Sequence, residues 1–203
     1  MNSARASCQS GIGGSPARRS IILSRREFFG RGAGRGNSSV VQGATACVFP
    51  ARRKISCASS NHVICRISWL YGHGGPSFVH AMMSLADGTR PMLKVVADQH
   101  GNPTSTTAVA RQLRNILAKP ELVGTFHLTC EGEATWFEFA QEIFRLAGKT
   151  QAVSPCTTDE FPRPAPRPKN SRLDKMMLRL AGLPPMPDWH DALAEFMKSE
   201  FPG

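Results

Sequence analysis

The chain has 203 residues and a formal net charge of +10, which allows one medium-sized domain, or one domain and a tail. The excess charge is confined to one part: residues 1–66 hold eleven Lys/Arg and one acid, whereas residues 67–203 hold fourteen Lys/Arg and fourteen Asp/Glu. This balance excludes a basic nucleic-acid-binding surface in the second part. No run approaches the roughly 18 apolar residues of a membrane span, so no membrane partner is expected and we predict a cytoplasmic protein.

The first sixty residues differ in composition from the rest of the chain. Residues 1–60 are rich in Arg, Ser, Gly and Ala and show neither helical nor strand periodicity. We expect this segment to be a basic leader that is disordered or mis-translated. Our hypothesis is that out-of-frame coding sequence is joined to a genuine domain near residue 61, where charge and periodicity change abruptly.

Two motifs in this segment are similar to known functional motifs. The glycine run at residues 30–36 is similar to a dinucleotide-binding loop, but no buried strand precedes it and no convincing helix follows it. Residues 24–29 resemble a twin-arginine export motif, yet polar residues interrupt the apolar region that export requires. An Arg/Ser-rich, acid-poor leader is also typical of an organelle transit peptide.

The six cysteines are scattered, with no C-x-x-C pair and no Cys/His spacing typical of zinc. Free thiols in a reducing compartment are therefore expected, and no metal site. We assign no role to His73, His100 or His127, because no carboxylate or metal-ligand pattern surrounds them in the sequence.

The remainder of the chain alternates between strand and helix patterns. Expected strands cover residues 62–67, 92–97 and 124–129, and expected helices cover residues 77–87, about 106–118, 136–147 and about 172–181, with a last helix after Asp188. Thr135 and Glu138 have the spacing of a capping box at the start of the third helix. Strands separated by helices indicate an α/β class, and residues 61–203 have the pattern of the C-terminal part of a larger α/β domain.

Four blocks of this part carry a family resemblance. They are RISWLYG at 66–72, VVADQHGNPT at 95–104, WFEFA at 136–140 and RPKNSRLD at 167–174. In order and spacing they resemble the C-terminal, substrate-binding half of dTDP-4-dehydrorhamnose reductase, an extended short-chain dehydrogenase. The resemblance implies the C-terminal part of an NAD(P)-binding Rossmann-like fold.

The resemblance also implies a reaction and a ligand. The family reduces the 4-keto group of dTDP-4-dehydro-6-deoxy-L-mannose to make dTDP-L-rhamnose with NADPH or NADH, so a nucleotide sugar is the expected partner; a homodimer is a further expectation. The residues that the resemblance places in the substrate-binding half or its framework are Trp69, Asp98, Gln99, Pro103, Thr104, Arg167 and Asn170.

For several of these residues, the alternative to a ligand-binding role is a purely structural role. Trp69 is either a platform for the sugar or a core residue, and Asp98 and Gln99 either bind the sugar or close their loop. Arg167 either pairs with the diphosphate or is a solvated loop charge. Trp136 is expected in the core. Where the family often has Gly-Asn-Asn-Phe, this chain has GPSF ending at Phe78, so the polar contacts of those asparagines are in doubt.

The catalytic residues of the family are not matched. Reduction of a ketone requires a bound hydride donor and an acid, which the family supplies as Tyr-x-x-x-Lys. The one tyrosine here is Tyr71, and the residue four positions later is Gly75. A credible cofactor glycine loop is absent as well, so we predict a chain that is inactive alone and lacks the cofactor site. The alternative is a non-catalytic nucleotide-sugar-binding or regulatory subunit, similar to the beta subunit of methionine adenosyltransferase. If the early strands of the domain are missing, the remaining sheet has an unpaired edge that is open to aggregation or to pairing with another chain.

Overall fold

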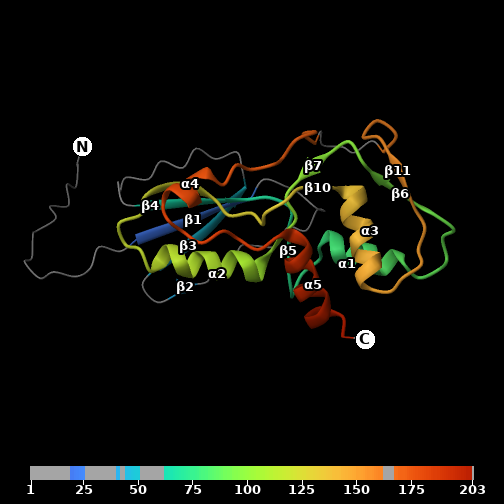
Figure 1. Ribbon diagram of the computed structural model, residues 1–203, viewed down its shortest axis with the longest axis horizontal. Helices are drawn as coiled ribbons and strands as arrows, with labels where there is room; N and C mark the ends of the chain where they lie inside the picture. Colours follow the sequence, from blue (N-terminus) through green and yellow to red (C-terminus); the bar gives the residue numbers. More distant parts are fainter. Residues whose placement is uncertain (1–18, 26–39, 42–43, 51–61, 162–166, 203) are drawn as a thin grey trace, which may run out of the picture.

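The computed structural model describes residues 19–25, 40–41, 44–50, 62–161 and 167–202, with side chains from residue 62 onward (Figure 1). The predictions for the glycine run at 30–36 and for most of the arginine motif at 24–29 lie outside the described residues. Figure 1 shows a mixed α/β molecule in which one end holds the main sheet with α2 and α4, and the other end holds α1 and α3 beside short strands.

The main sheet has five strands in the order β2-β3-β1-β4-β9. Their bounds are β1 Arg19–Arg25, β2 Val40–Val41, β3 Ala44–Pro50, β4 His62–Ile67 and β9 Gly124–His127. All pairs are parallel except β2 with β3. Strand β4 is therefore paired on both sides, with Val63 opposite Ile21 of β1 and Cys65 opposite Phe126 of β9.

The structure differs from the sequence-based expectation for part of residues 1–60. No strand was expected there, but β1 pairs with β4 along the edge that does not pair with β9. The apolar run of β1 is only Ile21-Ile22-Leu23, flanked by serines and arginines, so it is too short to show periodicity in the sequence. The division of the chain at residue 60 stays a prediction.

Three short strand pairs lie outside the main sheet. Strand β5 (Leu70–Tyr71) pairs with β8 (Thr104–Ser105), β7 (His100–Gly101) with β10 (Ala134–Thr135), and β6 (Leu93–Val96) with β11 (Val153–Cys156). The expected strand at 92–97 thus exists as β6 but pairs with β11 and not with the main sheet, and no strand was predicted at residues 153–156.

Helices form where apolar spacing and N-terminal caps coincide. They are α1 Phe78–Leu85, α2 Thr106–Leu117, α3 Trp136–Leu146, α4 Met176–Leu180 and α5 Trp189–Glu200. Ser77, Ser105, Thr135 and Asp188 each accept a hydrogen bond from a backbone amide in the first turn. The capping box of Thr135 and Glu138 is confirmed, with both of its hydrogen bonds formed.

Helix α4 is shorter than expected. The sequence predicted a helix from about residue 172, but the amide of Leu173 donates to Oδ1 of Asn102 at 2.9 Å, and the backbone around Ser171 bonds to His100. These contacts hold residues 170–175 extended against the loop after β7, and Lys175 at the N-cap position makes no side-chain cap. Tertiary hydrogen bonds therefore delay the start of the helix.

One hydrophobic core extends from the main sheet to the end of the molecule that holds α1 and α3. It includes the strand face of Val63, Cys65 and Ile67 and the buried stripes of α2, α3 and α5. The three cysteines with described side chains are free and buried, and burial raises the pKa of Cys65 to about 12. Within the described ranges, no helix combines the length and the apolar character needed to cross a membrane.

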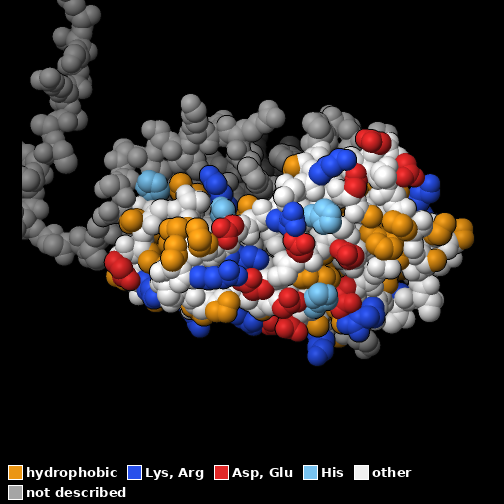
Figure 2. Space-filling model, turned by 45° about the horizontal axis from the view of Figure 1, so that its top comes forward, with side chains coloured by type: hydrophobic (Ala, Val, Ile, Leu, Met, Phe, Trp, Pro, Cys, Tyr) orange, Lys and Arg blue, Asp and Glu red, His pale blue; other side chains and the backbone are white. Residues whose placement is uncertain are grey.

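The surface charges of the described part are mixed in sign. Figure 2 shows Lys and Arg side chains interspersed with Asp and Glu side chains over one face of the molecule. The described part of the chain has exposed ion pairs, such as Arg172 with Glu133 at 2.7 Å and Arg179 with Glu131 at 3.3 Å. This face therefore has no continuous basic patch, in agreement with the balanced charge of residues 67–203.

Candidate functional site

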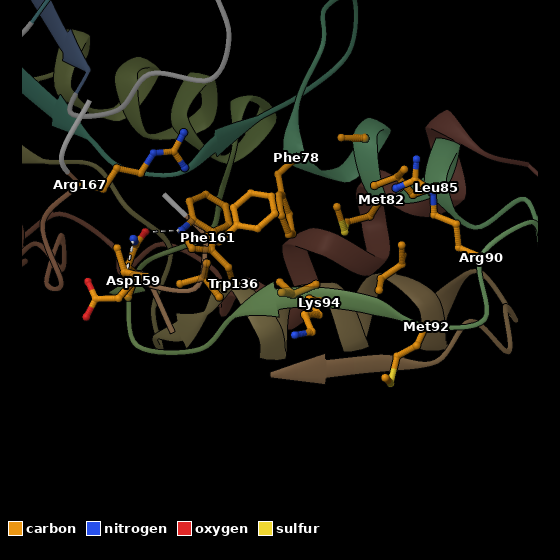
Figure 3. Close-up of a pocket in the computed structure, with 16 residues that line it drawn as sticks. Phe78, Met82, Leu85, Arg90, Met92, Lys94, Trp136, Asp159, Phe161 and Arg167 are labelled. Atoms are coloured by element: carbon orange, nitrogen blue, oxygen red, sulfur yellow. Dashed lines mark hydrogen bonds between the residues drawn. The ribbon is translucent and has the colours of Figure 1, made fainter. Parts of the chain in front are cut away.

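A cavity of about 560 Å³ lies between α1, β6, the start of α3 and the segment that follows β11 (Figure 3). Most of its lining is apolar or aromatic, and the side chains that give it this character are Phe78, Met82, Leu85, Met92, Val95, Trp136 and Phe161. Figure 3 shows Arg167 and Arg90 at opposite ends of the row of labelled side chains, with Trp136, Phe78 and Met82 between them. A largely apolar pocket with a few polar groups is typical of a small-molecule site.

The charged groups of the cavity are mainly cationic. Arg90, Lys94 and Arg167 line it, and Asp159 is the one carboxylate among the described lining residues. Lys94 also lies 3.8 Å from Glu160, outside the lining. A concave site with this excess of cations favours an anionic ligand. Guanidinium groups suit phosphate because their planar fork matches two of its oxygens.

Trp136 forms an aromatic wall of the cavity, backed by Trp69. The two indoles stack with ring centroids 3.6 Å apart and planes 7° from parallel. Trp136 lines the cavity, whereas Trp69 lies behind it and is 3% exposed. Phe78 contacts the Trp136 ring at 4.7 Å between centroids. Trp136, which is 6% exposed, is thus a core residue as predicted and also lines the cavity, whereas Trp69 is a core residue that does not line it.

The backbone around Trp69 explains how the stack is held. Trp69 has φ of +46°, in the left-handed region, and no other described residue except glycine has positive φ. Its indole N–H donates to Oγ of Ser171 at 2.9 Å, and its carbonyl accepts from the amide of Thr104 at 3.1 Å. A Cβ on Gly101 would lie 2.2 Å from the Trp69 ring, so this position requires glycine for the ring to fit.

Asp98 and Gln99 occupy different positions relative to the cavity. Gln99 lines it, with Oε1 accepting from the indole of Trp136 at 3.2 Å and Nε2 donating to the hydroxyl of Thr158 at 3.0 Å. Asp98 Oδ1 accepts from the same hydroxyl at 2.6 Å, and Lys169 Nζ lies 3.6 Å from Oδ2. The hydrogen bond from Thr158 lowers the pKa of Asp98 below its ordinary value of 3.8.

Three other expected site residues do not line the cavity. Thr104 is fully buried, donates to the carbonyl of Asn102 at 2.9 Å and accepts from the amide of Cys130. Pro103 is buried beside it. Asn170 is exposed and accepts from the guanidinium of Arg172 at 3.0 Å. The structure thus brings Gln99 and Arg167 together in one cavity, and their role in binding a sugar nucleotide stays a prediction.

The sequence did not single out several residues of the cavity. Phe78 and Met82 are one turn apart in the helix predicted at 77–87 and both are buried, but the sequence could not show that this face meets β6. Arg90 and Phe161 lie in irregular segments without periodicity. The GPSF departure ending at Phe78 keeps the aromatic ring in the cavity, and its Ser77 caps α1.

Tyr71 does not have the environment of a catalytic acid. It is 2% exposed, packs against the rings of Phe139 and Phe196, and its hydroxyl has no hydrogen-bond partner among the described residues. Burial raises its pKa above the ordinary value of 10.0. A proton donor for a forming alkoxide needs access to the ligand and a lowered pKa, and Tyr71 has neither.

Comparison with known proteins agrees with the family resemblance of the four sequence blocks. A family model described as the RmlD substrate binding domain matches residues 48–201, so the match begins upstream of the expected boundary at residue 61. The dTDP-4-dehydrorhamnose reductase of Streptomyces griseus is 42% identical over 137 residues, which are 65% of this chain and 45% of the relative. The chain spans about half the length of the curated relatives it matches.

Solved structures show the same similarity in three dimensions. A dTDP-4-dehydrorhamnose reductase from Clostridium acetobutylicum has a TM-score of 0.65 and 45% sequence identity, and the match covers 68% of this chain and 49% of that one. The reductase of Bacillus anthracis, solved in complex with NADP, has a TM-score of 0.64 and 39% identity, and the match covers 68% and 48% of the two chains.

Proposed function

The chain belongs to the RmlD substrate-binding-domain family, and we propose on that premise that its cavity binds a dTDP-sugar as the substrate-binding half of a dTDP-4-dehydrorhamnose reductase. The proposed substrate is dTDP-4-dehydro-6-deoxy-L-mannose. The observation that carries this proposal is the combination of aromatic walls and arginines in one cavity of about 560 Å³.

The base and the diphosphate of a nucleotide sugar have proposed counterparts in the cavity. We place the thymine ring against Phe78 and Trp136, because flat apolar rings stack favourably on aromatic side chains. Met82 and Val95 offer apolar surface to its methyl group. We place the diphosphate at Arg167, which lies at the aromatic end of the cavity in Figure 3.

The described residues do not fit the chemistry of the nicotinamide cofactor. In the family the cofactor, NADPH or NADH, supplies the hydride, and a tyrosine activated by a lysine supplies the proton. Here Tyr71 is enclosed by Phe139 and Phe196 and is not part of the cavity. We therefore propose that this chain binds the sugar nucleotide but does not reduce it alone.

A non-catalytic role is the second candidate, and the burial of Tyr71 favours it. In this alternative the chain is a nucleotide-sugar-binding or regulatory subunit. Purification of the full chain from its source together with a catalytic subunit would support this alternative. The proposal of a homodimer is tested by light scattering, in which a mass of twice 22.1 kDa is expected.

The experiment that tests the binding proposal is calorimetric titration of the full chain with dTDP and with thymidine. Arg167→Ala should weaken dTDP binding about tenfold, because a guanidinium–phosphate contact is lost. The same variant should bind thymidine as the wild type does, since thymidine has no phosphate.

A matched control is Arg111→Ala. Arg111 is an exposed arginine on α2. It pairs with Glu195 on α5 and does not line the cavity. This variant should bind dTDP with wild-type affinity. Equal affinity of wild type and Arg167→Ala for dTDP, or no binding by the wild type, would refute the proposal.

A further inference from the structure

A chain of three hydrogen bonds connects the aromatic wall of the cavity to the segment that follows β11. The indole N–H of Trp136 donates to Oε1 of Gln99 at 3.2 Å, and Nε2 of Gln99 donates to Oγ1 of Thr158 at 3.0 Å. The hydroxyl of Thr158 in turn donates to Oδ1 of Asp98 at 2.6 Å. The members come from three parts of the sequence that meet only in the fold.

The direction of these hydrogen bonds is fixed by chemistry. An indole N–H can only donate, and an ionised carboxylate can only accept. Gln99 between them must therefore turn its oxygen to Trp136 and its amide nitrogen to Thr158. Gln99 is 5% exposed, so a loss of either partner would leave a buried polar atom unpaired.

The segment tied by this chain is itself part of the cavity. We call residues 157–161 the strap; its Thr158, Asp159 and Phe161 line the cavity. One further contact ties the strap to Asp98, because the amide of Thr158 donates to its Oδ1 at 2.9 Å. Within the strap, the amide of Thr157 donates to Glu160 at 3.0 Å. A single glutamine thus contacts both the wall and the strap.

We propose that Gln99 is a positioning residue that fixes the Trp136 indole against Trp69 and couples this wall to the strap. Its effect on ligand affinity rests on the proposed function, whereas its effect on the wall and the strap does not. Both surfaces that Gln99 contacts, Trp136 and Thr158 of the strap, line the cavity, so their relative position shapes its aromatic end.

The test compares Gln99→Leu with Gln112→Leu in the full chain. Gln112 is a matched control because it is 3% exposed and also uses both ends of its amide, donating to the carbonyl of Pro184 at 3.0 Å and accepting from Asn115 at 3.1 Å. It lies on α2 and does not line the cavity. Both variants remove a buried amide, so a general loss of stability affects both.

Three quantities are measured. The first is the circular-dichroism couplet that two closely stacked indoles produce, and the second is hydrogen exchange of the Thr158 amide. The third is the Kd for dTDP. Gln99→Leu should reduce the couplet, accelerate exchange about tenfold and raise the Kd about tenfold, while Gln112→Leu leaves all three unchanged.

A second pair of variants keeps the test decisive if Gln99→Leu does not fold. Thr158→Val removes the hydroxyl with little change of shape, and Thr158→Ser retains it. Exchange in the strap should be faster in Thr158→Val and restored in Thr158→Ser. An unchanged couplet and unchanged exchange in Gln99→Leu, or equal exchange in the two Thr158 variants, would overturn the proposal.

If the wild type does not bind dTDP, the proposed function fails, and the couplet and the exchange still decide the role of Gln99.

Discussion

The Trp69 ring lies so close to the backbone of Gly101 that no side chain fits between them. Gly101→Ala would place a Cβ 2.2 Å from the ring, so either the ring or strand β7 must move. Overpacking of this kind typically costs about 1–3 kcal/mol. We predict that Gly101→Ala lowers the free energy of unfolding by about 2 kcal/mol in denaturant titrations.

The control for this prediction is Gly75→Ala. A methyl group added at Gly75 would have no neighbouring atom within 4 Å, and Gly75 has no positive φ, so alanine is accommodated there. We expect a change of less than about 0.5 kcal/mol for this variant. Equal stability of Gly101→Ala and Gly75→Ala would show that the Trp69 ring is not held where the structure places it.

Single residues also show where sequence-based prediction reaches its limit. Trp69 follows a predicted strand and was a candidate sugar platform, while Trp136 starts a predicted helix and was expected in the core, which is confirmed. The fold places Trp69 behind Trp136 because Ser171, about one hundred residues away in sequence, accepts its indole N–H. No local sequence pattern indicates this hydrogen bond between Trp69 and Ser171.

Among the elements, helix α3 connects stability to the site most directly. Its capping box ties Thr135 and Glu138 together, and its first residue is Trp136 of the cavity wall. Thr135→Ala should lower the free energy of unfolding by about 1 kcal/mol, because two hydrogen bonds at the helix start are lost. Urea denaturation measures this change.

Thr107→Ala is the matched control, since Thr107 lies in the first turn of α2 but is not its cap. Alanine has the higher helix propensity, so stability should stay the same or rise slightly. If Thr135→Ala were no less stable than Thr107→Ala, the capping box would not contribute as the structure indicates.

Elements with strong local signals were predicted well. Helices α1, α2, α3 and α5 have caps and a clear apolar face, and all four form close to the predicted residues. Strand β1 and the pairing of β6 with β11 were missed, because pairing partners are set by the tertiary fold and short strands have little periodicity.

At the scale of the whole molecule, the proposed function separates ligand binding from catalysis. Tyr71 is buried away from the cavity, so the full chain with NADPH and dTDP-4-dehydro-6-deoxy-L-mannose should oxidise no NADPH above the rate without protein. A complete dTDP-4-dehydrorhamnose reductase, such as that of Clostridium acetobutylicum, is the positive control. Oxidation at a comparable rate by this chain would disprove the separation.

The cavity as a whole could not be predicted from the sequence, although the family could. Four blocks in the right order indicated the family, and the comparisons confirm it. The cavity, however, combines the apolar face of α1, strand β6, the start of α3 and the strap. Gln99 and Thr158 are 59 positions apart, and the sequence contains no signal that they meet.

The measurement that tests the central claim most directly is a crystal structure of the full chain in complex with dTDP. We predict the thymine ring against Phe78 and Trp136, with the diphosphate at Arg167. A nucleotide bound outside this cavity, or in it with the phosphates at Arg90 and the ring away from Trp136, would contradict the proposed function.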